Sequence, residues 1–343
     1  MITQKLSIFD IVTDENAIAS AAEILKSGGL VAIPTETVYG LAADTFNEKA
    51  VANIFKAKGR PQDNPLIVHV SSMEMLEWVV DDIPEKALLL AQKFWPGPFT
   101  MVLPRGKRVP ASVSAGLDTV AVRMPASLVA RSIIEKTGLP LAAPSANLSG
   151  SPSPTTADHV LRDLDGKIDA VVVSERAEVG VESTVITLCT QPPRLLRPGG
   201  VTLEQLREVL PDIEVDKAVL SQLEKGEKAA SPGMKYKHYS PSAKVVMLDG
   251  PIEKFAEYVN ARKDDGVFAL VFSGEEKLLE VKTLSFGEKD NQSEQAAVLF
   301  DVLRRLDELD CKLCFARVPE KSGVGLAVYN RLIRAAAFEV IKL

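Results

Sequence analysis

The sequence is poor in the residues that build disulfide-bonded or zinc-binding proteins. It has only three cysteines and three histidines among 343 residues, and three cysteines cannot pair completely. Cys311 and Cys314 form a C-x-x-C pair, a spacing also found in redox-active thiols and in half of a zinc site. No further ligands follow at metal spacing, so we interpret both as small apolar residues of a buried strand, beside Leu313 and Phe315.

Long apolar runs are also missing. No run approaches the roughly 20 residues needed to cross a bilayer, and residues 1–10 lack the charged start and apolar core of a signal peptide. The net charge of −6 and the pI near 5.4 give no general attraction for a polyanion. We therefore expect a cytoplasmic globular protein that does not enter a membrane and that needs a local basic patch to bind nucleic acid.

The common glycine-rich phosphate loops are absent as well. The sequence has no G-x-x-x-x-G-K-[ST] motif, and Gly323-Val324-Gly325 lacks the third glycine of a dinucleotide fingerprint. The nucleophile motif G-x-S-x-G and the zinc motif H-E-x-x-H do not occur either. If the protein binds a nucleotide, cationic side chains must therefore neutralise the phosphates.

The sequence does contain helical and strand-like segments in alternation, enough for two domains. A chain of 343 residues exceeds what one core usually fills, since domains run to about 100–200 residues. We place the first domain at residues 1–210 and a second domain at residues 244–343. Between them, residues 211–243 form a linker, because the composition there turns polar and basic.

The strand pattern predicts an α/β fold. In the first domain some strands are continuous apolar runs and others follow at short spacing, which indicates a mixed, twisted sheet. The strands expected there cover residues 30–33, 66–70, 100–103, 119–124, 139–143, 168–173 and 183–188. In the second domain strands alternate with helices, which indicates a small parallel sheet with helices on its faces, in the Rossmann-like manner.

Two cations project from a predicted rigid turn. Lys58-Gly59-Arg60-Pro61 follows a predicted helix, where Gly59 can end the helix and Pro61 restricts Arg60 to extended geometry. An ammonium beside a guanidinium can hold phosphate or carboxylate oxygens. The same two cations can instead offset the helix dipole or point into water, and the pattern leaves both interpretations open.

Two arginines end apolar strands. Arg123 ends the run 119–122, and Arg197 follows the apolar pair 195–196. An arginine in such a position needs an anionic partner or a path to solvent. For each of them a structural ion pair is as good an explanation as ligand binding.

Smaller polar residues lie at the ends of other predicted strands. Ser145 and Asn147 follow the run 139–143, and Ser183 leads into the strand 183–188. Ligands usually bind at the lip of an α/β sheet, although Ser and Asn also stabilise turns. His69 lies inside an aliphatic strand, where a hydrogen-bonded core histidine is commoner than a ligand.

Taken together, the motifs resemble the Sua5/YrdC family, and in particular its two-domain Sua5 branch. They occur in the family's order and spacing at residues 34–41, 58–61, 64–69, 144–147, 181–184, 197–199 and 237–241. The resemblance covers the first domain and the linker, while the second domain agrees in pattern only. It implies a YrdC-like twisted mixed sheet with a concave basic pocket, a linker that closes over the site as a lid, and a small Sua5 C-terminal domain.

The resemblance also implies an activity. A nucleotidyltransferase of this kind makes L-threonylcarbamoyl-adenylate and pyrophosphate from L-threonine, bicarbonate or CO2, and ATP, with Mg2+ bridging the phosphates. The product is the first intermediate of N6-threonylcarbamoyladenosine at position 37 of tRNA. A separate threonylcarbamoyl transferase complex then passes the group to tRNA, and a weak tRNA contact of this chain is compatible with that role.

Finally, the resemblance implies which residues form the site. The L-threonine site comprises Thr35, His69, Arg123, Ala143 and Ser183, with Arg123 pairing the carboxylate. The ATP and bicarbonate site comprises Lys58, Arg60, Thr119, Ser145, Asn147, Ser153 and Arg197, with His238 and Tyr239 of the linker near the nucleotide. Lys58 and Arg60 are the catalytic cations, and neither a protein metal ligand nor a covalent enzyme intermediate is expected.

A function of another class fits the same resemblance. The family's concave basic surface resembles that of a double-stranded RNA or tRNA binding module, which predicts salt-sensitive binding that is indifferent to threonine. The acidic overall balance favours the enzyme. A carbamoyl-transfer domain of the hydrogenase-maturation type shares the fold, but its acylphosphatase and zinc-finger segments are not visible here.

Overall fold

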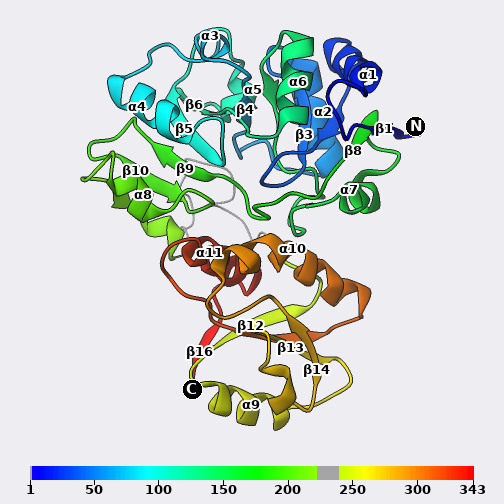
Figure 1. The fold of residues 1–343 in the computed structure, drawn as a ribbon, viewed down its shortest axis with the longest axis vertical. Coiled ribbons are helices and arrows are strands. Elements are labelled where there is room, and N and C mark those ends of the chain that lie inside the picture. The colour runs from blue at the N-terminus through cyan, green and yellow to red at the C-terminus, as the bar shows by residue number, and fades with distance from the viewer. Residues whose placement is uncertain (1, 222–238) are drawn as a thin grey trace. The chain divides into compact units, whose positions relative to one another are not determined.

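The computed structural model describes residues 2–221 and 239–343, which divide into two compact units. Unit 1 contains residues 2–149 and 153–221, and unit 2 contains residues 150–152 and 239–343 (Figure 1). Most of the predicted linker lies outside the described residues, so this division does not decide the boundaries expected at residues 210 and 243.

An 11-stranded mixed sheet is the framework of unit 1, with the order β1-β8-β2-β3-β7-β4-β6-β5-β9-β10-β11. Its strands are β1 (Gln4–Ser7), β2 (Val31–Ile33), β3 (Gly40–Asp44), β4 (Ile67–His69), β5 (Phe99–Pro104), β6 (Thr119–Arg123), β7 (Leu141–Ala142), β8 (Ala170–Val173), β9 (Thr184–Thr187), β10 (Arg194–Arg197) and β11 (Glu214–Val215). In its centre β4 runs parallel to β6 and antiparallel to β7. The predicted mixed sheet is confirmed.

Helices connect these strands and cover the sheet (Figure 1). They are α1 (Glu15–Lys26), α2 (Glu48–Lys58), α3 (Met73–Leu76), α4 (Glu85–Phe94), α5 (Ala111–Ser114), α6 (Leu128–Thr137), α7 (Ala157–Leu164), α8 (Leu203–Arg207) and the short 3-10 helix η1 (Lys217–Val219). At the start of α2 the side chain of Asn47 accepts a hydrogen bond from the Ala50 N–H. The helix ends at Gly59 in the left-handed conformation, as predicted, so Lys58 is its last residue.

The two faces of the central strands differ, because successive side chains of a strand point to opposite faces. One face belongs to the large core, which includes Val68, Met101, Val122 and Ile186 together with helix residues such as Phe55, Leu90 and Ile133. The other face carries a separate small apolar cluster of Ile67, Val102, Ala121, Val185, Leu196 and Ala218. We call this second face the site face. The polar residues discussed below lie on it, because along the same strands they alternate with residues of the large core.

Unit 2 contains a five-stranded parallel sheet with the order β14-β13-β15-β12-β16. Its elements are β12 (Lys244–Asp249), α9 (Ile252–Asn260), β13 (Val267–Val271), the 3-10 helix η2 (Glu276–Leu278), β14 (Lys282–Ser285), α10 (Gln292–Glu308), β15 (Leu313–Arg317), α11 (Gly325–Ala335) and β16 (Val340–Lys342). Figure 1 shows the strands between α9 on one side and α10 and α11 on the other. This is the predicted three-layer arrangement.

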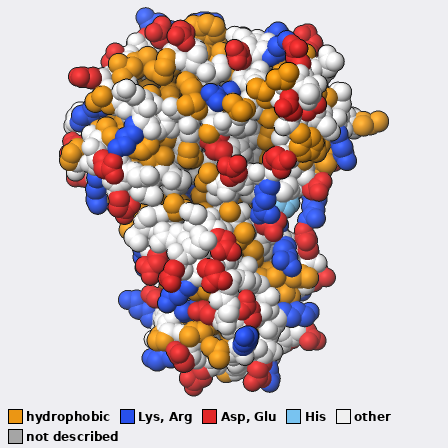
Figure 2. Space-filling model, in the orientation of Figure 1, with side chains coloured by type: hydrophobic (Ala, Val, Ile, Leu, Met, Phe, Trp, Pro, Cys, Tyr) orange, Lys and Arg blue, Asp and Glu red, His pale blue; other side chains and the backbone are white. Residues whose placement is uncertain are grey.

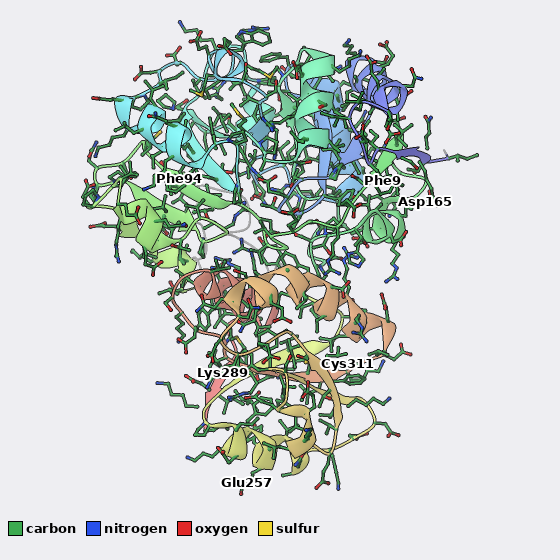
Figure 3. All side chains as sticks on the ribbon, in the orientation of Figure 1. Phe9, Phe94, Asp165, Glu257, Lys289 and Cys311 are labelled. Carbon is green, nitrogen blue, oxygen red and sulfur yellow. The ribbon has the colours of Figure 1, made fainter. Side chains whose placement is uncertain are left out.

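The C-x-x-C pair belongs to the packed interior of unit 2. Cys314 lies within β15 and Cys311 just before it, labelled in Figure 3, and both are buried and free. Burial raises the pKa of the Cys311 thiol to about 11 and raises the pKa of Cys314 well above its usual value. A thiolate is therefore disfavoured at both positions, which supports the apolar interpretation over redox chemistry.

The helices and the surface can be compared with those of membrane-spanning proteins and of proteins that bind polyanions. Within residues 2–221 and 239–343, no helix combines the length and apolarity needed to cross a membrane. On the face shown in Figure 2, Lys and Arg side chains are interspersed with Asp and Glu and form no continuous basic surface. This mixture agrees with the net charge of −6.

Candidate active site

A threonine-rich turn borders the site face. Residues 34–39 connect β2 to β3, and the Thr35 hydroxyl donates a 2.6 Å hydrogen bond to the Val38 carbonyl within this turn. The Thr35 Oγ1 also lies 2.8 Å from Thr37 Oγ1 and accepts from the Thr37 N–H. These local bonds are the kind that Thr makes in place of regular structure, and they fix both hydroxyls.

Arg123, at the end of β6, is joined to this turn by its guanidinium. Its Nη1 donates to Thr37 Oγ1 at 2.8 Å, its Nε donates to the Gly97 carbonyl at 3.1 Å, and its Nη2 forms a 2.5 Å ion pair with Glu36 Oε1. The Arg123 side chain is 4% exposed and that of Glu36 is 9% exposed. Of the two alternatives expected for Arg123, an anionic partner or a path to solvent, the structure shows the anionic partner, Glu36, which belongs to the same motif as Thr35.

The pairing with Arg123 determines the protonation state of the Glu36 carboxyl group. Burial acts to raise the pKa of the Glu36 carboxyl, but the Arg123 charge and several hydrogen bonds outweigh burial and lower the pKa overall. Glu36 is therefore ionised at neutral pH. It is a weak base that holds the guanidinium in place.

His69 lies beside Arg123, because β4 and β6 pair in parallel with these two residues in register. The ring is buried, and its Nδ1 is 3.3 Å from the Ile67 carbonyl oxygen. Burial, and then the Arg123 charge, lowers the pKa of His69 to about 3. The imidazole is therefore neutral at physiological pH and can serve as a hydrogen-bonding group but not as a cation.

Two hydroxyls extend the site to β5 and β9. Thr100 pairs with Arg123 across the β5–β6 ladder, and its Oγ1 is 2.8 Å from Ser183 Oγ. Arg197 donates from Nη2 to Ser183 Oγ at 3.1 Å and from Nε to the Ser183 carbonyl at 3.0 Å. A bulge between Leu195 and Arg197 shifts the register of β10 and so re-aims the arginine.

A second group forms around Lys58. Its Nζ donates to the carbonyl oxygens of Ser145 and Asn147, each at 2.5 Å, and the side chain is almost fully buried. The Ser145 hydroxyl donates to Asn147 Oδ1 at 2.6 Å, which closes the turn. Arg60 leaves the same helix end but holds a different loop, since its Nη2 donates to the Pro65 carbonyl at 3.1 Å.

The two groups border one surface. Ser145 follows β7 and lies beyond the amino end of β4, where the Ala143 N–H donates to the Ile67 carbonyl, while His69 and Arg123 lie at the carboxyl end of their strands. Because β4 has three residues, its ends are only about 7 Å apart. A bridge between Gly40 and Ser145 also ties the threonine-rich turn to the Lys58 group. Two members of the small apolar cluster, Ile67 and Ala121, lie on β4 and β6 two residues before His69 and Arg123.

The remaining sequence-predicted residues lie at varied distances from this centre. Thr119 begins β6 on the same face as Arg123 but about 13 Å away along the strand. Ser153 donates to the buried carboxylate of Glu182. Tyr239 belongs to unit 2, where its ring lies 5.3 Å from that of Phe300, and His238 lies outside the described residues. The roles of all these residues stay predictions.

The structure adds polar residues that the sequence analysis did not single out. They are Glu36, Thr37, Thr100 and Glu182. Two of them, Glu36 and Glu182, are acids inside the motifs at residues 34–41 and 181–184, and an acid next to a predicted strand end is a usable signal. Among residues 2–221 and 239–343, no group of three or more His, Cys, Asp or Glu side chains could hold a metal ion.

Two family models account for nearly the whole chain. A model named Sua5_yciO_yrdC and described as "Telomere recombination" matches residues 23–199. A model described as "Threonylcarbamoyl-AMP synthase, C-terminal domain" matches residues 201–337. The chain belongs to the Sua5/YrdC family. Its two models also identify it with the two-domain Sua5 branch, as the motifs indicated.

Curated relatives match over the full length. A threonylcarbamoyl-AMP synthase of Pyrococcus abyssi (strain GE5 / Orsay) is 46% identical over 335 residues, 96% of this chain and 97% of the relative. One of Bacillus subtilis (strain 168) is 44% identical over 337 residues, 97% of this chain and 96% of the relative. These Sua5 proteins therefore share both domains with this chain.

A solved Sua5 structure agrees with both units. The crystal structure described as P. abyssi Sua5 complexed with L-threonine has a TM-score of 0.93 and 44% identity, and each chain covers 100% of the other. The predicted fold class, a twisted mixed sheet followed by a small Rossmann-like domain, is confirmed by this likeness.

Proposed function

We propose that this chain is an L-threonylcarbamoyladenylate synthase. It joins L-threonine, bicarbonate or CO2, and ATP into threonylcarbamoyl-AMP and releases pyrophosphate. The observation that carries the proposal is the full-length likeness to relatives of that name at 44–46% identity. The site geometry supports it, because buried cations and hydroxyls border one surface from two sides without a glycine-rich phosphate loop.

The threonine end of the site is proposed to lie at Arg123. A guanidinium held from three directions offers a rigid partner for the α-carboxylate, and the fixed hydroxyls of Thr35 and Ser183 are suited to the polar groups of threonine. Neutral His69 adds a hydrogen-bonding group without a second buried charge. Glu36 is a positioning residue, because its lowered pKa makes it a poor proton acceptor.

The chemistry needs alignment more than a nucleophilic side chain. The threonine nitrogen loses a proton and bonds to the carbon of CO2, and an oxygen of the resulting carbamate bonds to the α-phosphorus of ATP. The bond from that phosphorus to pyrophosphate breaks at the same centre. Several anions therefore share one site, and neutralising them is the main task of the protein.

The cations proposed for that task are Lys58, Arg60 and Arg197. Main-chain carbonyls fix the direction of Lys58 Nζ and of the Arg60 guanidinium, so little reorganisation is needed when phosphate oxygens arrive. Arg197 donates to Ser183 of the proposed threonine end, which supports a role for it beside the nucleotide and the amino acid. Ser145 and Asn147 shape the turn that holds Lys58.

The residues of this site are compatible with Mg2+ that enters bound to ATP. The nearby carboxylates are engaged, Glu36 with Arg123 and Glu182 with Ser153, so neither is placed as a metal ligand. We propose that Mg2+ arrives on the phosphates with few protein ligands, as is common for nucleotide sites, and offsets their charge. The chain's own residues then orient the amino acid and the α-phosphorus.

A downstream partner follows from the product. An acyl-phosphate anhydride of this kind hydrolyses in water, so it must be consumed quickly by a transferase that acts on tRNA. We propose a tRNA threonylcarbamoyl transferase complex as that partner, with at most a weak contact between this chain and tRNA.

The direct test uses purified full-length protein with ATP, Mg2+, labelled bicarbonate and each amino acid in turn. We expect pyrophosphate release that requires both threonine and bicarbonate, together with a labelled adenylate. L-Valine, which has a similar shape but no hydroxyl, is the matched control and should give much less product. Pyrophosphate release that is equal with and without threonine would overturn the proposal.

Replacing Arg123 tests the division of the site. Arg123→Ala removes the guanidinium proposed for the carboxylate, so the KM for threonine should rise about tenfold or more, since charge-assisted hydrogen bonds are lost. The Kd for ATP, measured by equilibrium dialysis, should change about twofold or less. Equal losses for both substrates would contradict separate threonine and nucleotide ends.

A further inference from the structure

The topology of unit 2 singles out one point of its sheet. From β13 the chain continues outward to its neighbour β14, whereas from β15 it passes over β12 to β16 in the opposite direction. The neighbouring strands β13 and β15 therefore feed connections that diverge. In open α/β sheets, ligands bind outside the carboxyl ends of the strands at such a point.

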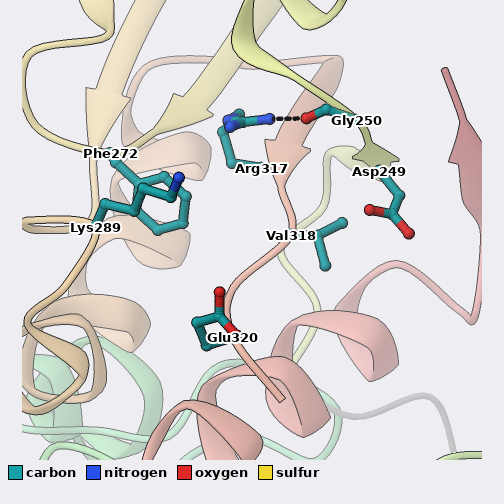
Figure 4. A pocket seen from close by; sticks show the side chains of 7 residues that line it. All are labelled: Asp249, Gly250, Phe272, Lys289, Arg317, Val318 and Glu320. Carbon is teal, nitrogen blue, oxygen red and sulfur yellow. Dashed lines mark hydrogen bonds between the residues drawn. The ribbon is translucent and has the colours of Figure 1, made fainter. Parts of the chain in front are cut away.

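A cavity of about 180 Å³ lies at this point. It is lined by Asp249, Gly250, Phe272, Lys289, Arg317, Val318 and Glu320 (Figure 4). These residues come from the carboxyl ends of β12, β13 and β15 and from the segment before α10. All belong to unit 2, so the cavity is complete within it.

The floor of the cavity is rigid and its charge is compensated. Arg317 is 7% exposed, its Nη1 donates to the Gly250 carbonyl at 2.6 Å, and its Nε pairs with Glu275 Oε2 at 3.1 Å. The guanidinium carbon also lies 5.4 Å from the ring centroid of Phe255. This arginine therefore shapes the cavity and does not by itself attract an anion.

The rim of the cavity carries charges of both signs that are available to a ligand. The side chains of Lys289, Asp249 and Glu320 form no hydrogen bond or ion pair with residues 2–221 or 239–343. Figure 4 shows Lys289 beside Phe272 on one side of the cavity and Asp249 beside Val318 on the other. Like charges in a small site repel and opposite charges attract. The rim therefore favours a ligand that carries both a negative and a positive group.

This arrangement excludes simpler ligands. A phosphate or a nucleotide would face the carboxylates of Asp249 and Glu320, and a simple cation would face the ammonium of Lys289. The volume of about 180 Å³ is also below the roughly 300–1,000 Å³ of pockets that hold larger ligands. A small molecule with one negative and one positive end meets both conditions.

We propose that this cavity binds a free L-α-amino acid. Its carboxylate pairs with Lys289, its ammonium pairs with Asp249, and its side chain packs against Phe272 and Val318. The site is separate from the threonine end proposed in unit 1 and goes beyond the synthase reaction, since none of its residues is assigned a part in catalysis.

The test is equilibrium dialysis of the full chain against each labelled L-amino acid at millimolar concentrations. We expect saturable binding of at least one amino acid that Arg123→Ala leaves unchanged. Lys289→Met and Asp249→Asn should each weaken this binding about tenfold or more, since each removes a charge-assisted hydrogen bond. Lys277→Met is the matched control, because Lys277 is an exposed lysine of the same unit outside the cavity.

Three results would overturn the proposal. One is the absence of saturable binding beyond any threonine that Arg123→Ala removes. Another is unchanged amino-acid binding in Lys289→Met and Asp249→Asn, with thermal unfolding showing that both variants are folded. The third is displacement of the amino acid by inorganic phosphate or AMP at lower concentration than by a second amino acid. None of these results bears on the synthase assay.

Discussion

At the scale of single residues, the sequence indicated the needs of the buried charges but not their partners. Arg123 required an anion or a path to solvent, and the structure answers with Glu36, 87 positions away along the chain. Which acid approaches a strand end depends on the strand order of the sheet, which pairs segments far apart in sequence. The two interpretations of Arg123, ion pair and ligand site, are therefore compatible, because one guanidinium can hold Glu36 and face the site.

Replacing Glu36 should lower the stability of the folded chain. Glu36→Gln leaves the Arg123 charge buried without its counter-charge, and breaking a buried pair in this way costs about 3–5 kcal/mol. The free energy of unfolding, measured with urea, should fall by an amount in this range. Glu15→Gln is the control, because Glu15 pairs with Lys136 on the surface and should change stability by about 1 kcal/mol or less. Similar effects of both substitutions would contradict a buried, coupled pair.

The neutral state of His69 predicts a pH dependence of stability. With a pKa of about 3 in the folded chain and an ordinary value near 6.5 when unfolded, the unfolded state binds more protons between these values. This contribution is therefore complete above pH 6.5 and is lost as the pH falls toward 3. Between pH 7 and pH 5 it should lower the free energy of unfolding by roughly 2 kcal/mol. His69→Gln should reduce that slope, and an unchanged slope would show that His69 is not buried in its neutral form.

At the scale of elements, the sequence predicts the helices and strands that have strong local signals, whereas several other strands are seen only in the structure. The end of α2 follows from Gly59, which adopts the left-handed conformation. The central strands of the second domain follow from their apolar runs. The sequence does not predict six of the described strands: β1, β3, β10, β11, β14 and β16. Four of them, β1, β11, β14 and β16, are short edge strands defined by their partners, whereas β3 and β10 lie inside the large sheet. β1, for example, pairs with β8, about 165 positions later. The alternation that brings polar side chains to the site face was present in the sequence, but which of the two faces packs against the large core was not.

Gly59 links an element boundary to the site and allows a matched comparison. Both Gly59 and Gly138 end a helix with positive φ, at 60° and 66°, and in both cases an added Cβ would meet no atom within 4 Å. Gly59→Ala and Gly138→Ala should therefore each lower the free energy of unfolding by about 1 kcal/mol, the cost of left-handed backbone. Only Gly59→Ala should raise the KM for ATP, since Lys58 precedes Gly59. An equal change in the KM for ATP in both variants would contradict the role of the Lys58 turn.

At the scale of the whole molecule, the residues proposed for the site in unit 1 come from separate stretches of chain that the strand order of the large sheet brings together. Their sequence spacing alone did not reveal that order, and the resemblance to the Sua5/YrdC family was needed to group them. Overall charge was informative in another way. The net charge of −6 gives no general attraction for a polyanion, and the face shown in Figure 2 carries no continuous basic surface.

This charge balance predicts how the molecule binds RNA and how that binding depends on salt. Non-specific binding to a polyanion requires several cations in reach of successive phosphates, and its affinity falls steeply with salt in proportion to their number. We expect only weak binding of a 20-base-pair RNA duplex by fluorescence anisotropy at physiological salt, without effect of L-threonine. Synthesis of the adenylate should persist under the same conditions, because its cations are buried and poorly screened. An unmodified tRNA is the comparison that detects a contact specific to its shape. Tight duplex binding with a steep salt slope, in a chain whose pyrophosphate release ignores threonine, would instead favour the RNA-binding module.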